Sequence, residues 1–330
     1  MFEAQVMRGL VIKSTGTTYG VLLSDGTIAD CHVKGNFRIR GIRSTNPIAI
    51  GDKVEVKQNE DGINWITELH DRKNYIVRRS TNLSYASHIL AANVDMAALI
   101  VTVNHPKTST TFIDRFLATC EAYRVPACLI FNKIDLLNEQ EVQTLAQLRQ
   151  LYESLGYPTY AISAISLSSS QDDLVAAIFD GKVTLLSGNS GVGKSTLLNA
   201  ILGKDIARTG AISSAHHKGM HTTTFSEMYP LHAFETSEML APPSTSQNRS
   251  WIIDTPGIKG FGMLDMERSE IGHYFREIFQ IGRECRYSDC IHINEPGCAV
   301  NQAVKEGEIA FSRYESYLSM LDDITENKYR

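Results

Sequence analysis

The chain has 330 residues, of which 43% are hydrophobic and 21% charged, and its formal net charge is −5. This length accommodates two or three globular domains, and the composition and acidic charge exclude a disordered chain, a fibrous chain and a protein that coats nucleic acid over its whole surface. No apolar stretch reaches the length of a membrane span and the N-terminus lacks a signal-peptide pattern, so we expect a cytoplasmic protein without a membrane partner.

Residues 1–75 alternate apolar and polar positions in short runs separated by Gly and Asp turns. This pattern is typical of a small antiparallel barrel, and we predict an OB-type β-barrel of five strands; a generic β-sandwich is the alternative. The segment is also mildly basic. The candidate phosphate contacts are Arg38, Arg40 and Arg43 in this segment and Arg72, Lys73, Arg78 and Arg79 at the domain junction, although a solvated charged face explains any one of them as well.

From residue 93 onward, continuous apolar runs alternate with helical patterns. Buried strands separated by helices indicate a parallel sheet covered on both faces, so residues 76–266 are predicted to form a doubly wound α/β domain. The segment 231–250 is rich in Ser, Thr and Pro and is predicted to be a surface loop. Residues 267–330 are predicted to form a mainly α domain that ends in one helix over 301–323.

A phosphate-binding loop is predicted at 188–195, where the chain reads GNSGVGKS between a strand and a helix. Glycines let successive N–H groups and the helix N-terminus face phosphate oxygens. Lys194 is expected to reach the β- and γ-phosphates, and Ser195 to ligate Mg²⁺. The predicted phosphate contacts are Gly188, Asn189, Ser190, Gly191, Val192, Gly193, Lys194, Ser195 and Thr196.

The NKID run at 132–135 follows a buried strand and predicts a guanine-reading loop. One carboxylate, that of Asp135, can accept both N1–H and N2–H₂ of guanine, a donor pair that adenine lacks. The Lys133 stem can cover the base, and Asn132 can tie this loop to the phosphate loop. Ser163 and Ala164 follow the next strand, where a backbone N–H can bond guanine O6.

Downstream, the run DTPG places Asp254 at a strand end and Gly257 three residues later. Asp254 is expected to hold Mg²⁺ through water, and the Gly257 N–H to sense the γ-phosphate. One of Thr222, Thr223 and Thr224 is expected to complete Mg²⁺ coordination in a switch loop over about 207–226; a loop entering an edge strand is the alternative.

The order of these motifs is shuffled, because the base-reading loops precede the phosphate loop. We therefore predict a circularly permuted GTPase domain. Ile258 stands where many GTPases place a water-orienting glutamine, so slow intrinsic hydrolysis is expected unless another group supplies that function. His221 is the candidate for that role, against the alternative of a structural or exposed histidine.

A metal site is predicted in the C-terminal segment, where three cysteines and a histidine fall within fourteen residues. Closed sets of thiolate and imidazole ligands are typical of a structural Zn²⁺ site, with one ion per chain; free thiols in a small core are the alternative. The predicted ligands are Cys285, Cys290, His292 and Cys298.

Taken together, NKID, SA, GNSGVGKS, HTTT, DTPGI and the Cys/His set closely resemble the bacterial ribosome small-subunit-dependent GTPase A family over nearly the whole chain, including the terminal Arg313-Tyr314 helix. The resemblance implies a late assembly factor of the small (30S) ribosomal subunit, whose GTP hydrolysis the subunit stimulates and whose release follows hydrolysis. It also implies that the OB barrel and the zinc domain bind 16S rRNA. Met220 and the long 231–250 loop depart from the expected pattern, and we take the protein to be a monomer.

Two other functions stay open from the residues alone. One is a nucleotide-gated RNA-binding module with negligible turnover, which a phosphate-release measurement with small subunits separates from an assembly enzyme. The other is a P-loop kinase or ATPase, which competition between GTP and ATP excludes or supports.

Overall fold

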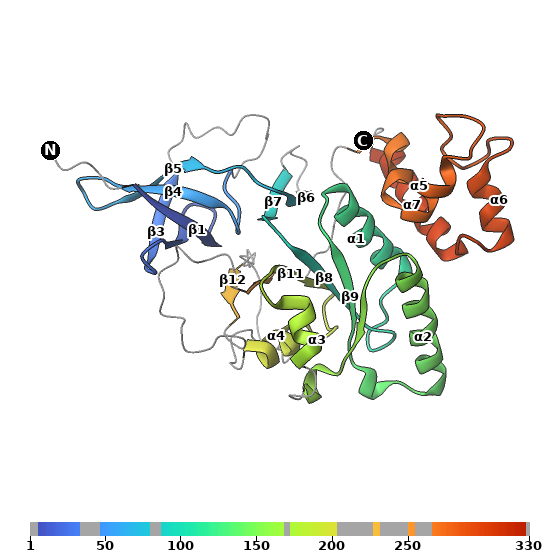
Figure 1. Cartoon of the computed structure of the whole chain (residues 1–330), viewed down its shortest axis with the longest axis horizontal. Coiled ribbons are helices and arrows are strands. Elements are labelled where there is room, and N and C mark those ends of the chain that lie inside the picture. The colour runs from blue at the N-terminus through green and yellow to red at the C-terminus, as the bar shows by residue number, and fades with distance from the viewer. Residues whose placement is uncertain are drawn as a thin grey trace, which may run out of the picture.

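The computed structural model describes residues 6–33, 47–79, 87–167, 172–202, 227–231, 250–254 and 266–327. Three parts follow one another along the long axis, as Figure 1 shows: a barrel, a central α/β unit and a C-terminal helical unit. None of the helices in these ranges is both long and apolar enough to cross a bilayer.

The N-terminal part is a closed barrel of five strands, with the order β1-β2-β3-β5-β4 and a further β1–β4 pairing that joins the ends. All pairings are antiparallel except that of β3 with β5. Alternate side chains point inward, so Val11, Val21, Cys31, Val54 and Ile66 form its core. The prediction of a five-stranded barrel is confirmed, and the sandwich alternative is wrong. The strands are β1 (Val6–Ser14), β2 (Tyr19–Leu23), β3 (Ile28–Val33), β4 (Lys53–Gln58) and β5 (Asn64–Leu69).

The central sheet has the order β10-β9-β8-β11-β13-β12, in which the first five strands are parallel and β12 is an antiparallel edge. Side chains of β8 alternate between the two faces: Leu99 and Val101 pack under α1 and α2, whereas Ala98 and Ile100 pack under α3 and α4. The strands are β8 (Met96–Val101), β9 (Ala127–Phe131), β10 (Thr159–Ala161), β11 (Val183–Gly188), β12 (Glu227–Pro230) and β13 (Trp251–Asp254); the helices are α1 (Thr110–Ala122), α2 (Glu139–Ser154), α3 (Asp172–Phe179) and α4 (Lys194–Leu202).

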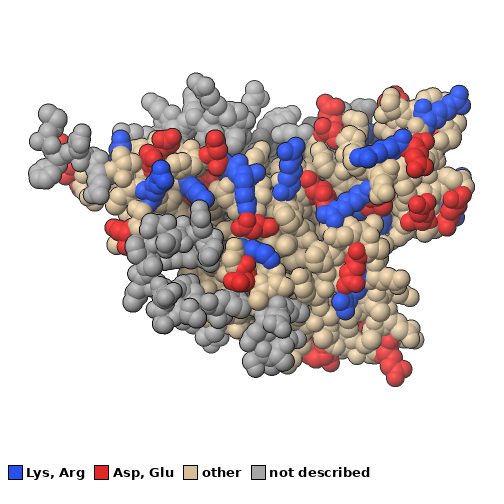
Figure 2. Space-filling view, in the orientation of Figure 1, with Lys and Arg blue, Asp and Glu red and all other residues tan. Residues whose placement is uncertain are grey.

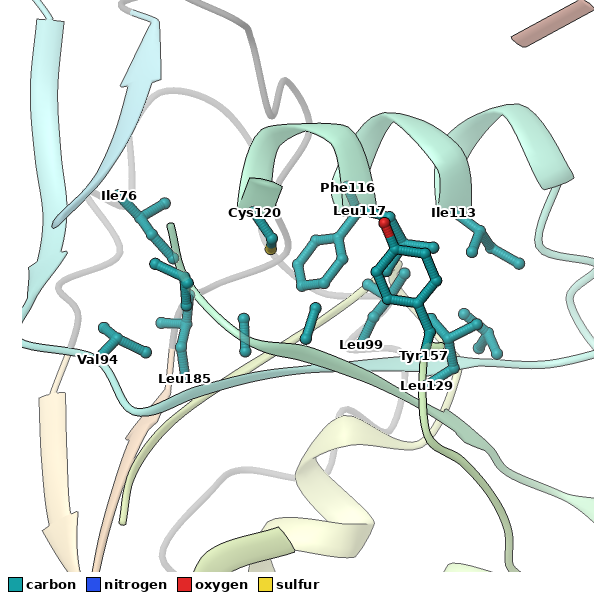
Figure 3. Packing of buried hydrophobic residues seen from close by; sticks show 14 of the residues in the cluster. Ile76, Val94, Leu99, Ile113, Phe116, Leu117, Cys120, Leu129, Tyr157 and Leu185 are labelled. Atoms are coloured by element: carbon teal, nitrogen blue, oxygen red, sulfur yellow. The ribbon is translucent and has the colours of Figure 1, made fainter. Parts of the chain in front are cut away.

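Helix α1 lies along the sheet with one apolar stripe turned toward the strands (Figure 3). Ile113, Phe116, Leu117 and Cys120 are each 1% exposed and pack on Leu99 and its neighbours. Their spacing is that of a helix face buried on a sheet. The opposite face of α1 is left to contact the C-terminal unit.

The barrel is joined to the central sheet by the pairing of β12 with β1 and, along the chain, by two strands between β5 and β8. Strand β12 pairs with β1 at the register Lys13↔Glu227, and these two side chains form an ion pair of 3.3 Å. Strands β6 (Tyr75–Arg79) and β7 (Ser87–Ala92) form a separate antiparallel pair. The sequence analysis did not predict this pair because both runs are short and strand pairing depends on a partner beyond the local window.

The C-terminal unit packs its helices around Ile271, Phe275, Val300 and Leu321. The expected single helix over 301–323 is wrong, since two helices cover this range. Gly307 ends the first of them in the left-handed conformation (φ 79°), where a residue with a Cβ is disfavoured. The elements are the 3₁₀ segment η6 (Arg268–Tyr274), α5 (Arg276–Gly282), α6 (Ala299–Glu306) and α7 (Phe311–Asn327).

Candidate nucleotide-binding site and metal centre

The GNSGVGKS loop lies between the end of β11 and the start of α4, and its conformation requires glycine. Gly191 and Gly193 have φ values of +83° and +95°. A Cβ at Gly193 would lie 2.3 Å from Asn132 Nδ2, so the amide of the base-reading loop approaches the backbone here without an intervening side chain. Ser195 and Thr196 are half-buried in the first turn of α4.

Asn132 connects three loops that are far apart in the sequence. Asn132 is 3% exposed. Its side-chain amide donates to the carbonyl of Val192 over 2.8 Å and accepts from the Ala164 N–H over 2.9 Å. A buried amide with both ends bonded fixes its neighbours in place. The loops at 132–135, 163–164 and 188–195 therefore meet at one side chain. The Ala164 N–H, one of the backbone donors in the second predicted base-reading loop, bonds the buried Asn132 oxygen in this structure.

The base-reading loop continues this convergence. Ser163 donates its hydroxyl to the carboxylate of Asp135, which is exposed at the mouth of the site. Lys133 adopts a left-handed backbone conformation (φ 64°), and its ammonium donates to the carbonyls of His105 and Gly191, each over 2.6 Å. Its side chain thus links the base-reading loop to the loop after β8 and to the phosphate loop.

One element of this site was missed by the sequence analysis, namely the loop 102–109 after β8. Besides accepting from Lys133, it places the Pro106 ring 3.4 Å from where a Gly191 Cβ would be. Within the loop, the Thr102 N–H donates to Thr108 Oγ1 over 3.1 Å. Loops that follow parallel strands lie together at the carboxyl edge of the sheet. Applied to the strand that ends before residue 102, this rule could have placed the loop 102–109 at the site.

Strand β13 brings Asp254 beside β11, at the register Leu186↔Asp254. Its carboxylate forms an ion pair with the ammonium of Lys194, and the two side chains are only 23% and 12% exposed. The lysine and the carboxylate predicted for phosphate and Mg²⁺ therefore lie side by side. Other predicted residues fall outside the described ranges and are not placed: His221, Thr222, Thr223, Thr224, Gly257 and Ile258, together with most of the 231–250 loop.

Replacing Gly193 with alanine is expected to weaken GDP binding and to lower the free energy of unfolding by about 1–3 kcal/mol, because the new Cβ must displace Asn132 and adopt a strained φ. Isothermal calorimetry and chemical unfolding measure the two effects. Gly16→Ala is the matched control, since Gly16 has a similar φ of +88° but no atom within 4 Å. Equal losses of GDP affinity in both variants would contradict the contact with Asn132.

A cleft of about 830 Å³ lies elsewhere, between the barrel and the central sheet. Asp95, Val183 and Trp251 line it from the amino ends of the parallel strands, whereas the nucleotide loops lie at the carboxyl ends. This cleft is therefore not the predicted nucleotide site.

Two basic residues near this junction are engaged within the protein. Arg72, 5% exposed, binds Asp52 through two hydrogen bonds of 2.7 and 2.6 Å, and Lys73 pairs with Asp95. Because the Arg72 guanidinium is buried in an ion pair, it cannot reach a phosphate. The prediction of Arg72 as a phosphate contact is therefore wrong. Arg38, Arg40 and Arg43 lie outside the described residues.

The four predicted metal ligands come together in the C-terminal unit, with their donor atoms all within 4.8 Å of one another. The distances are 3.5 Å from His292 Nδ1 to both Cys285 Sγ and Cys298 Sγ, and 3.8 Å between these two sulfurs. Around a tetrahedral Zn²⁺ with ordinary bond lengths, a ligand nitrogen and a ligand sulfur lie about 3.6 Å apart, and two ligand sulfurs lie about 3.8 Å apart. The distances among Cys285, His292 and Cys298 therefore fit a zinc ion, and Cys290, within 4.8 Å of the other donors, is placed to be its fourth ligand.

The protonation of the cluster agrees with this chemistry. Burial lowers the pKa of His292, which favours the neutral imidazole that a metal binds. Burial also raises the pKa of the Cys290 thiol to about 12, so binding of a cation must release a proton from this sulfur near neutral pH.

The parallel sheet, the phosphate loop and the base-reading loops that precede it define a circularly permuted P-loop GTPase. The chain matches the family described as RsgA N-terminal domain over residues 8–66 and the family described as RsgA GTPase over residues 69–264. A curated relative, small ribosomal subunit biogenesis GTPase RsgA of Phocaeicola vulgatus, is 56% identical over 98% of this chain and 99% of that protein. The chain therefore belongs to the RsgA GTPase family and is a GTP-hydrolysing enzyme.

Solved structures show the same architecture. The crystal structure of YjeQ from Thermotoga maritima is 31% identical with a TM-score of 0.72, covering 97% of this chain and 99% of that one. The structure of YloQ, titled a circularly permuted GTPase, is 27% identical with a TM-score of 0.68, covering 99% and 97%. Both likenesses extend over all three parts of the fold.

Proposed function

We propose that this GTPase acts late in the assembly of the small (30S) ribosomal subunit, that the subunit stimulates its hydrolysis of GTP, and that hydrolysis releases it. The name of the Phocaeicola vulgatus relative, at 56% identity over 98% of the chain, supports the role in biogenesis of that subunit. The proposal includes a cytoplasmic monomer without a membrane partner. It also divides the chain at 1–75, 76–266 and 267–330, a division supported by hydrophobic clusters centred in each of the three parts.

The proposed nucleotide site is the pocket of loops joined by Asn132. The convergence at this one buried amide is the observation that carries the assignment, because loops 60 residues apart meet there. Asp135 reads the guanine edge while Lys133 covers the base. The phosphate contacts are Gly188, Asn189, Ser190, Gly191, Val192, Gly193, Lys194, Ser195 and Thr196, with Ser163 and Ala164 supporting Asp135 and Asn132.

Phosphoryl transfer here depends on positioning and charge. Ser195 and Asp254 are the residues that would hold Mg²⁺, which neutralises charge on the β- and γ-phosphates when bound. Lys194 leaves its ion pair with Asp254 to donate to the phosphates, so that Asp254 becomes free for the cation. The Gly257 N–H contacts the γ-phosphate, one of Thr222, Thr223 and Thr224 would complete the coordination of Mg²⁺, and His221 is the candidate that orients water.

The RNA contacts are proposed for the barrel and the C-terminal unit, with 16S rRNA as the ligand. Figure 2 shows lysine and arginine side chains along one face from the barrel to the C-terminal unit, with acidic side chains between them. In the barrel, Arg8, Lys53 and Lys57 are exposed on β1 and β4. Contacts of this kind bind phosphates with an affinity that falls as salt rises.

The test of the proposed function is phosphate release with and without purified small subunits. Because Ile258 cannot orient water, slow hydrolysis by the isolated protein and a large stimulation by the subunits are expected. Large subunits are the control. Turnover that small subunits never raise would favour the alternative, a nucleotide-gated RNA-binding module with negligible turnover.

Replacing Asp135 with asparagine is expected to reduce the preference for GTP over ATP by at least about tenfold, since an amide oxygen accepts only weakly from the guanine donors and the amide N–H₂ opposes them. The bond from Ser163 can persist in this variant. Competition of GTP and ATP for a fluorescent GDP analogue gives the ratio, with the exposed Asp180→Asn as control. An unchanged ratio would remove Asp135 from the site.

A further inference from the structure

The last helix, α7, carries a motif to which the proposed function gives no role. Arg313 on this helix is 1% exposed and lies between two carboxylates from different parts of the chain. It donates to Asp114 of α1 over 2.7 Å and to Glu277 of α5 over 2.6 and 3.1 Å. Burial by itself would lower the pKa of Arg313, but the two carboxylates raise that pKa by more than burial lowers it. The guanidinium therefore stays charged.

The same helix also holds the metal-binding loop. Tyr314 donates its hydroxyl to the carbonyl of His292 over 2.7 Å, and Tyr317 donates to the carbonyl of Ile291 over 2.7 Å. The motif at 313–317 thus contacts the metal loop with its tyrosines and the central domain with its arginine. Helix α7 therefore joins the metal centre to α1.

At its other end, α1 begins at the nucleotide site. Ser109 caps the helix by accepting from the Phe112 N–H over 3.2 Å. The loop before this cap supplies the His105 carbonyl that holds Lys133, and the Pro106 ring beside Gly191. Asp114 is five residues past the cap, about 8 Å along the helix, so a shift of Asp114 moves this loop with it.

Helix α1 has little freedom between these contacts. Its apolar face is fixed on the sheet through Phe116 and Leu117 (Figure 3). On the other side, Arg115 donates to Ser319 Oγ over 2.8 Å and pairs with Asp323 over 2.7 Å, beside the contact of Asp114 with Arg313. Tyr152 of α2 also donates to Asp114 over 2.9 Å. A helix packed on both sides moves as one body rather than bending locally.

We infer that Arg313, by holding Asp114, positions α1 so that the loop 102–109 keeps Lys133 over the guanine site; Arg313 and Asp114 are positioning residues for nucleotide binding. The inference rests on the proposed nucleotide site. By linkage, nucleotide binding must stabilise the contact of α1 with α7 to the same extent as that contact strengthens nucleotide binding.

The test compares two isosteric variants that each remove one partner of Arg313. Asp114→Asn alters the link to the central domain, whereas Glu277→Gln alters a link within the C-terminal unit. Asp114→Asn is expected to weaken binding of a fluorescent GDP analogue by about fivefold or more, and Glu277→Gln to leave it unchanged. Thermal unfolding is recorded for both, because a purely structural role of Arg313 predicts equal effects on nucleotide binding.

A double-mutant cycle with Lys133→Ala identifies the route. If Asp114 acts through Lys133, Asp114→Asn has little further effect in the Lys133→Ala background. Equal effects of Asp114→Asn and Glu277→Gln on GDP affinity, no effect of Asp114→Asn, or its full effect without Lys133 would each overturn the inference. Failure of Lys133→Ala to weaken GDP binding would instead refute the proposed nucleotide site.

Hydrogen exchange on the unmodified protein covers the case in which Asp114→Asn does not fold. Saturating GDP is expected to slow amide exchange in the loop 102–109, in α1 and in α7, while strands of the barrel such as β4 serve as the reference. Slowing confined to residues 132–135 and 188–195 would show that α1 does not carry the coupling.

Discussion

Replacing Lys194 with alanine is expected to lower kcat for GTP hydrolysis by about 100- to 1,000-fold, the usual loss when one fixed donor to a developing anion is removed. Lys194 is only 12% exposed, and its ammonium lies at the junction of the phosphate loop and Asp254. No other lysine or arginine among the described residues pairs with Asp254, so its charge is not replaced. Single-turnover phosphate release at saturating subunit concentration measures the loss.

Two comparisons make the Lys194 result specific. The exposed Lys57→Ala on β4 is the control for loss of a positive charge; it is compared with Lys194→Ala without subunits, because Lys57 is a proposed RNA contact, and is expected to keep the intrinsic rate. Lys194→Ala should reduce GDP affinity by a smaller factor than it reduces kcat, because the proposed guanine contacts of Asp135 remain. Hydrolysis close to that of the unmodified protein would contradict the assignment of Lys194.

Removal of the metal is expected to unfold the C-terminal unit. The metal loop is tied to α7 by Tyr314 and Tyr317, and Cys298 also accepts the Asn301 N–H at the start of α6 over 3.4 Å. Structural zinc sites bind with about 10–16 kcal/mol, and this free energy is lost from folding when the ion is removed. Near-ultraviolet circular dichroism during titration with a strong chelator follows the tyrosines.

Cys298→Ser is the genetic counterpart, and elemental analysis of the purified variants supplies the metal content. The unmodified protein is expected to contain about one zinc per chain and the variant much less. Cys120→Ala is the control, because Cys120 is also buried but lies in α1, away from the cluster. A folded, metal-free unmodified protein would show that the four side chains form an ordinary core.

The local patterns of the sequence identified most of the fold. Alternation with period two predicted the barrel, and continuous apolar runs predicted the parallel sheet. Predictions failed where one residue or a short segment decides. Gly307 divides the last helix, because its left-handed conformation ends α6. The β6–β7 pair was not predicted because strand pairing depends on a partner beyond the local window.

For the site, the sequence by itself identified the residues that we propose carry the chemistry: Lys194, Asp135, Asp254 and the four predicted metal ligands each lie in a short motif whose spacing reflects one turn, one loop or one strand end. The tertiary structure alone decided what those residues touch. The His105 carbonyl that holds Lys133 has no sequence signature, since every residue has a carbonyl. The buried contact of Arg313 with Asp114 joins residues 199 positions apart, and only the packing of α7 on α1 brings their opposite charges together.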